Sequence, residues 1–102
     1  MKTQKIEEDN LSKFRIFETN QFVSDLNKIQ KSLQEKLRVK IQSYVYPQIS
    51  ENPYFGPNIR KLTDYKPETW RYRLGEYRLF YEIDDKEKIV FLISIDMRKD
   101  AY

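Results

Sequence analysis

The sequence contains neither cysteine nor histidine among its 102 residues. Without cysteine, the chain has no disulfide framework, no cysteine nucleophile and no thiolate ligand for a metal. Without histidine, it lacks the commonest general base and the commonest metal ligand. Any acid–base chemistry must therefore use aspartate, glutamate, lysine, tyrosine or arginine.

Long apolar runs are also missing, because no stretch approaches the roughly 20 residues of a membrane-spanning helix. The N-terminal sequence MKTQKIEEDN has no apolar signal-peptide core, so we expect a cytoplasmic protein without a membrane partner. The net charge of +3 is small for a chain of this length. A nucleic-acid site would therefore depend on where the arginines lie and not on how many there are.

Hydrophobic residues make up 39% of the chain and aromatic residues 15%, which is enough for one hydrophobic core. We predict a flexible N-terminal tail over residues 1–12 and a single domain over residues 13–102. A short strand is expected over residues 13–18, followed by a helix that Thr19 or Asn20 caps. Ser32 and Glu35 fit a capping box that opens a longer second helix, and Pro47 should end or kink that helix.

Residues 47–68 hold all four prolines and are predicted to form a structured loop. Three strands are expected after it, over residues 70–74, 77–83 and 89–97. Gly75 and Glu76 suit a two-residue type II′ turn with glycine leading. The chain is therefore predicted to be α+β, with an N-terminal strand and a two-helix hairpin packed on one face of a small, mainly antiparallel sheet.

The predicted hairpin turn assigns side chains to the two faces of this sheet. Arg73 should lie opposite Arg78, and Arg71 opposite Phe80, on the face without helices. Leu79 and the other alternate residues should face the helices. If the last strand follows an odd-length connection near residues 85–87, its apolar row also faces the helices: Ile89, Phe91, Ile93, Ile95 and Met97. Its other residues would join the arginines: Val90, Leu92, Ser94, Asp96 and Arg98.

Opposed arginines repel each other by up to about 1 kcal/mol unless something lies between them. A bound anion would relieve the repulsion between Arg73 and Arg78, because the flat guanidinium fork matches a phosphate. The alternative is that Glu82 or Asp96 pairs with these arginines and the face is merely solvated. Phe80 has two interpretations as well, since it could stack on a nucleic-acid base or pack under a loop.

Two stretches, NPYFGPNIRKL and WRYRLGEYRLFYEIDDKEKIVFLISIDMRKDAY, resemble the RelE/ParE superfamily of bacterial and archaeal toxins. The positions that fill the family pattern are Lys61-Leu62, Tyr72-Arg73, Gly75, Tyr77-Arg78, Arg98 and Tyr102. This resemblance implies a toxin held inactive by a cognate antitoxin protein. RelE-like members cut messenger RNA on the ribosome, whereas ParE-like members inhibit DNA gyrase without chemistry of their own. A non-toxic module that binds an antitoxin or a nucleic acid is a third possibility.

The RelE-like branch is the favoured interpretation, and it implies roles for individual residues. Arg73, Arg78, Arg98 and Tyr102 would be catalytic, with Tyr102 as the base and Arg78 and Arg98 holding the scissile phosphate. Arg71, Lys61 and Phe80 would bind the substrate. Attack by a ribose 2′-hydroxyl requires no metal and no cofactor. The sequence departs from many relatives, which read Gly-His-Arg where this chain has Asp96-Met97-Arg98.

Overall fold

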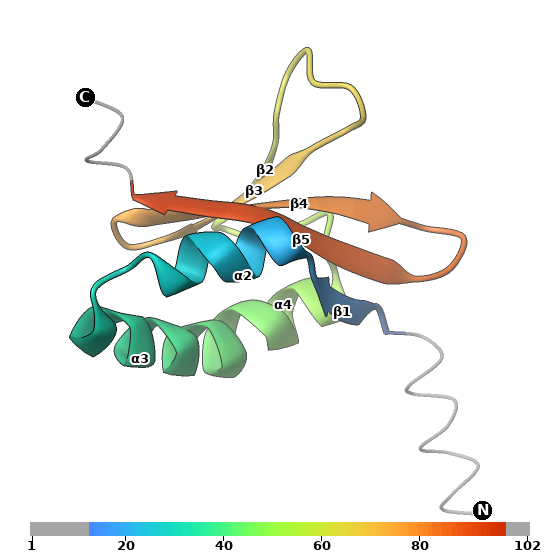
Figure 1. Cartoon of the computed structure of the whole chain (residues 1–102). Helices are drawn as coiled ribbons and strands as arrows, with labels where there is room; N and C mark the ends of the chain where they lie inside the picture. The colour runs from blue at the N-terminus through green and yellow to red at the C-terminus, as the bar shows by residue number, and fades with distance from the viewer. Residues whose placement is uncertain (1–12, 98–102) are drawn as a thin grey trace, which may run out of the picture.

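A computed structural model describes residues 13–97, which form a two-layer α+β fold (Figure 1). These residues build a five-stranded sheet in the order β1-β5-β4-β3-β2. The helices all lie on one side of the sheet, which leaves the opposite side, here called the open face, without a helical cover (Figure 1). The elements are β1 (Arg15–Glu18), α2 (Asn20–Asn27), α3 (Lys31–Lys40), a π-helical turn (Ile41–Val45), α4 (Tyr46–Glu51), β2 (Ile59–Lys61), β3 (Trp70–Leu74), β4 (Tyr77–Asp84) and β5 (Ile89–Met97).

Of the two caps that the sequence allows, Thr19 and Asn20, the structure selects Thr19. Its hydroxyl oxygen accepts a hydrogen bond from the backbone N–H of Phe22 at 3.3 Å, which satisfies a free donor of the first helical turn. The same hydroxyl donates to the carbonyl oxygen of Leu92 at 2.7 Å. Thr19 therefore begins α2 and also fastens it to β5.

The predicted second helix differs from the observed one at both ends. The capping box is wrong, because α3 begins at Lys31 with Gln30 as its N-cap, so that Ser32 lies inside the first turn. Pro47 does not end the helix, since the helical chain continues to Glu51. The π-helical turn Ile41–Val45 precedes Pro47, which then occupies the first turn of α4, where a missing N–H costs little.

The loop predicted over residues 47–68 contains more regular structure than expected. Besides α4 it includes β2, a three-residue strand that pairs antiparallel with β3. In this pairing Arg60 lies opposite Arg71, and Lys61 lies opposite Trp70. The sheet therefore extends one strand beyond the predicted hairpin.

The hairpin of β3 and β4 has the predicted register. Leu74 pairs with Tyr77, Arg73 with Arg78 and Arg71 with Phe80. Gly75 has a φ of 60°, a conformation that glycine adopts without the steric cost of a Cβ atom. A glycine-led two-residue turn thus joins the two strands, as the sequence predicts.

The prediction for β5 is right at its C-terminal end and wrong at its N-terminal end. Asp84 pairs with Ile89, so the connection of residues 85–88 has an even number of residues, and Ile89 and Phe91 lie on the open face. Val90 and Leu92, expected on the open face, are fully buried in the core. A β-bulge then skips Ile93 in the pairing with β4, which returns Ile95 to the core and leaves Ser94 and Asp96 on the open face.

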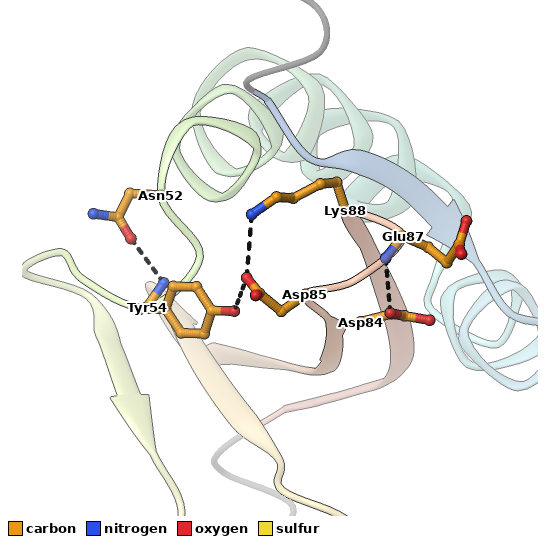
Figure 2. Close-up of polar contacts among 6 residues, drawn as sticks. All are labelled: Asn52, Tyr54, Asp84, Asp85, Glu87 and Lys88. Atoms are coloured by element: carbon orange, nitrogen blue, oxygen red, sulfur yellow. Dashed lines mark hydrogen bonds and ion pairs between the residues drawn. The ribbon is translucent and has the colours of Figure 1, made fainter.

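The connection between β4 and β5 is held by a polar cluster (Figure 2). Asp85 accepts a hydrogen bond from the Tyr54 hydroxyl at 2.8 Å and pairs with the Lys88 ammonium group at 3.2 Å. A carboxylate oxygen of Asp84 accepts from the backbone N–H of Glu87 at 3.0 Å. These contacts fix the even-length turn that places Ile89 opposite Asp84.

The core lies between the helices and the covered face of the sheet. The helices contribute Phe22, Leu26, Leu37, Ile41, Val45 and Ile49, and the sheet contributes Tyr72, Leu79, Tyr81, Val90, Leu92 and Ile95. The hydroxyls of the two fully buried tyrosines keep partners, since Tyr81 donates to the Pro53 carbonyl at 2.7 Å and Tyr72 to the Gln48 side chain at 2.9 Å. Across residues 13–97, every helix is too short or too polar to span a bilayer.

Candidate functional site

Arginines from three neighbouring strands meet on the open face. One rung of the sheet runs from Arg60 in β2 through Arg71 in β3 to Phe80 in β4. The next rung runs from Arg73 through Arg78 to Asp96 in β5. We call Arg60, Arg71, Arg73, Arg78 and Phe80 the arginine surface. Its rigid strands hold four guanidinium groups within two adjacent rungs.

Arg78 is the best-defined member of the arginine surface. Its Nε atom donates to one carboxylate oxygen of Asp96 at 3.0 Å, and a terminal nitrogen donates to the other at 3.2 Å. The guanidinium carbon also lies 5.8 Å from the centre of the Phe80 ring. Asp96 thus occupies the fork in the way that a phosphate would, with two parallel charge-assisted hydrogen bonds.

The other arginines are placed differently with respect to solvent. Arg60 and Arg73 are exposed, and neither makes an ion pair with any residue between 13 and 97. Arg71 is half-buried between them on β3. Asp96 therefore pairs with Arg78, whereas the charges of Arg60 and Arg73 stay unpaired within residues 13–97.

The structure brings four of the predicted site residues together: Arg71, Arg73, Arg78 and Phe80. Lys61 is separated from them, because the alternation along β2 points it to the face opposite Arg60. There its ammonium group pairs with Glu68 at 3.1 Å and lies 5.9 Å from the Trp70 ring. Arg98 and Tyr102, the other two predicted catalytic residues, and the tail over residues 1–12 lie outside the described residues.

Arg60 was missed by sequence reasoning. Its strand has only three residues and follows a proline-rich loop, so the alternation of Ile59, Arg60 and Lys61 is too short to identify a strand reliably. Only the pairing with β3 places Arg60 beside Arg71.

An apolar groove lies between the helices and the β3–β4 hairpin. It consists of two adjoining pockets of about 330 and 410 Å³ that share Leu33 and Tyr77. Its lining also includes Lys28, Lys36, Lys40 and Asp96. The Tyr77 hydroxyl is buried without a hydrogen-bond partner in the described part of the chain. Asp96 thus lines the groove and also pairs with Arg78 of the arginine surface.

The described tyrosines with shifted pKa values are poorly suited to act as bases. Burial, together with a 2.5 Å hydrogen bond to Glu18, raises the pKa of Tyr46 above its ordinary range. Burial likewise raises the pKa of Tyr81. Burial and the hydrogen bond to Asp85 raise the pKa of Tyr54 to about 12. Residues 13–97 also contain no cluster of three acidic side chains that would hold a metal ion.

Comparisons with known proteins agree with this geometry. The family model described as the ParE toxin of the type II toxin–antitoxin system parDE matches residues 16–102. No curated protein matches the chain. Among solved structures, the RelBE2 toxin–antitoxin complex from Mycobacterium tuberculosis is similar, with 24% identity and a TM-score of 0.66 over 86% of this chain and 94% of that one.

Two further structures share the fold. The intact RelBE complex of Escherichia coli has 23% identity and a TM-score of 0.60, covering 82% of this chain and 95% of that chain. The RelB–RelE complex of Methanococcus jannaschii has 21% identity and a TM-score of 0.57, covering 84% and 94%. At these identities the likeness concerns the fold.

Proposed function

Since the chain belongs to the ParE toxin family of type II toxin–antitoxin systems, a branch of the RelE/ParE superfamily, we propose that it is a toxin that cleaves messenger RNA on the ribosome. The observation that carries this proposal is the arginine surface, with four guanidinium groups in two adjacent rungs of the open face. Arginine keeps its charge at any working pH and binds phosphate through a planar fork of donors. Such a surface suits an RNA backbone and the charge that develops during its cleavage.

The chemistry assigns a task to each group. The phenolate form of Tyr102 takes the proton of a ribose 2′-hydroxyl, and the freed oxygen attacks the adjacent phosphorus atom. As the new P–O2′ bond forms, the P–O5′ bond breaks, and the 5′-oxygen leaves with a proton taken from water. Arg78 and Arg98 stabilise the extra negative charge of the transition state. The products are a 2′,3′-cyclic phosphate and a free 5′-hydroxyl.

Tyr102 needs cations nearby, because a tyrosine ordinarily has a pKa of about 10. Positive charges within a few ångströms favour the phenolate and lower that pKa. Arg71 and Arg73 add positive charge to the open face, and Phe80 offers a ring there for a base. Lys61, which lies on the opposite face, has no place in this version of the site.

Cleavage of a defined message on programmed ribosomes tests the proposal. Arg78→Ala should lower the rate about 10²–10³-fold, the usual loss for one transition-state donor. Tyr102→Phe should lower it roughly 10²-fold, as for a lost acid–base group, while ribosome binding persists. A 2′-O-methyl group at the cut site should block cleavage completely. Cleavage of the methylated message would exclude attack by the 2′-hydroxyl.

Inhibition of DNA gyrase is the second candidate function. Two observations favour it: the matched family model is that of ParE, and Asp96 already occupies the fork of Arg78. A gyrase inhibitor needs no catalytic base and no open phosphate site. A supercoiling assay with purified gyrase, run beside the ribosome assay, separates the two functions. Activity in neither assay would leave a non-toxic binding module.

A cognate antitoxin is the expected protein partner, as the RelBE complexes from other organisms suggest. The groove beside Leu33 and Tyr77 would accept apolar side chains of such a partner. Its lysines, Lys28, Lys36 and Lys40, favour acidic residues next to them. Co-purification from the native host should recover this partner, and failure to recover any tight partner would contradict the assignment.

A further inference from the structure

A pair of phenylalanines lies on the open face beside the arginine surface. Phe17 in β1 pairs with Phe91 in β5, and their ring centres are 5.6 Å apart in an edge-to-face arrangement. Phe17 is 56% exposed, although aromatic residues of this size usually lie inside. Phe91 reaches this face because of the even-length turn before β5. The bulge at Ile93 then returns Ile95 to the core.

The rung that contains this pair also contains a carboxylate. Glu82 in β4 lies opposite Phe91, so the rung reads Glu82, Phe91 and Phe17. Along β4, successive open-face residues are Arg78, Phe80 and Glu82, and two residues of a strand span about 7 Å. The surface therefore changes, within two such steps, from guanidinium groups to aromatic rings beside a carboxylate.

This change of chemistry matches the two parts of a nucleotide. A phosphate is attracted by the arginines and repelled by Glu82. An unpaired base, in contrast, is uncharged and stacks on an exposed aromatic ring. A glutamate oxygen can accept a hydrogen bond from an exocyclic amino group of cytosine or adenine, whereas uracil has no such group.

We propose that Phe17, Phe91 and Glu82 form a base-binding platform for an unpaired nucleotide of the RNA whose backbone lies on the arginine surface. The inference rests on the proposed function, because it requires RNA on the open face. One base stacks on the exposed ring of Phe17, which Phe91 supports edge to face, and Glu82 favours a base with an amino group. A protein partner fits the pair of Phe17 and Phe91 less well, because this patch is only two rings wide. The lysine-lined groove offers such a partner a larger apolar binding surface.

Fluorescence anisotropy with a labelled 2′-O-methyl RNA hexamer tests the platform at one fixed salt concentration. The base is removed from one position at a time, leaving an abasic sugar. With the wild-type protein, one abasic position should weaken binding by at least about 5-fold, the effect of one lost stacking contact. The Phe17→Leu variant should bind the intact hexamer more weakly than the wild type by the same factor. Removing the base at the critical position should then have no further effect on its binding.

Two more variants sharpen the test. Phe55→Leu is the matched control, because Phe55 is 82% exposed but belongs to none of the strands, and binding should stay at the wild-type level. Glu82→Gln should reduce the preference for cytosine or adenine over uracil at the stacked position. An unchanged preference would remove Glu82 from the platform.

The outcomes separate the platform from the proposed function. If Arg73→Ala weakens RNA binding but Phe17→Leu and the abasic sugars do not, the platform is overturned and the RNA function stands. If Phe17→Leu weakens antitoxin binding and leaves RNA binding intact, the patch is a protein contact and the platform is again overturned. If the protein shows no arginine-dependent RNA binding, both proposals fail together.

Discussion

Asp96 combines two roles at the scale of single residues. Its carboxylate neutralises Arg78, which relieves the repulsion from Arg73 directly opposite. It also occupies the donors that a phosphate would need. An ion pair between partly exposed groups contributes only about 0.2–1 kcal/mol, so an incoming phosphate can displace this carboxylate at a small cost.

Replacing Asp96 by asparagine should therefore strengthen RNA binding. The variant removes a negative charge and a competing acceptor, and we expect an increase in affinity of about 2- to 5-fold. The anisotropy assay measures this change, with Glu35→Gln on α3 as a control that removes the same charge elsewhere. Weaker binding by Asp96→Asn would mean that Asp96 orients Arg78 for the phosphate instead of competing with it.

Tyr54 makes the stability depend on pH in the alkaline range. Its pKa of about 12 in the folded protein lies above the value of about 10 for an unfolded tyrosine, because burial and the bond to Asp85 favour the neutral form. The neutral Tyr54 contributes fully to the free energy of unfolding below pH 10, and this contribution disappears as the pH rises from about 10 to 12. Urea unfolding between pH 8 and 11 should show that the free energy of unfolding falls more steeply with pH in the wild type than in Tyr54→Phe. Parallel curves would show that Tyr54 does not couple to folding.

At the scale of elements, β5 departs most from its expected pattern. Simple alternation would place Phe91 in the core and Leu92 outside, and the observed strand does the reverse until the bulge. The polar cluster around Asp85 sets the phase at the start of the strand (Figure 2). Thr19, bonded to the Leu92 carbonyl, ties the same segment to α2.

Alanine substitutions in β5 and β1 test which of their side chains face the core. Leu92→Ala should destabilise the protein by about 2–5 kcal/mol, because a fully buried side chain leaves a cavity. Phe17→Ala should change the stability by about 0.5 kcal/mol or less, as for an exposed site. Urea denaturation measures both free energies of unfolding. Equal losses for the two variants would contradict the placement of Phe17 and Leu92 on opposite faces.

At the scale of the whole molecule, the sheet divides two kinds of interaction. The helices cover one face of the sheet (Figure 1). The side chains of this covered face belong to the core, whereas the open face carries charged side chains and aromatic rings. Arg60 and Lys61 illustrate the division, because these neighbours in β2 point to opposite faces. Long-range attraction of RNA should therefore depend on the face of a cation and not on the net charge alone.

The salt dependence of RNA binding tests this division. The slope of log K against log salt concentration should become less steep by about 0.7 to 1 in Arg60→Ala and in Arg73→Ala. Each lost phosphate contact means that one fewer counterion is released on binding. Lys61→Ala removes the same charge beside Arg60 and should leave the slope unchanged. An equal fall in Lys61→Ala would contradict the proposed binding face.

The sequence by itself determined the parts of the fold that depend on local pairing. A two-residue turn led by Gly75 fixes which residues of β3 and β4 face each other, so Arg71, Arg73, Arg78 and Phe80 could be assigned to one face. The pair Thr19-Asn20 identified the start of α2 for the same reason, since a cap is a contact between near neighbours. The resemblance to the toxin superfamily was equally readable, because it depends on the order of residues along the chain.

Only the tertiary structure decided the features that depend on partners distant in sequence. The phase of β5, the strand that contains Arg60 and the face of Lys61 follow from pairings across the sheet. A bulge or a turn one residue longer reverses every later side chain, and a period of two cannot reveal it. The pairing of Asp96 with Arg78, and the placement of Phe17 and Phe91 on the open face, follow from the same long-range register.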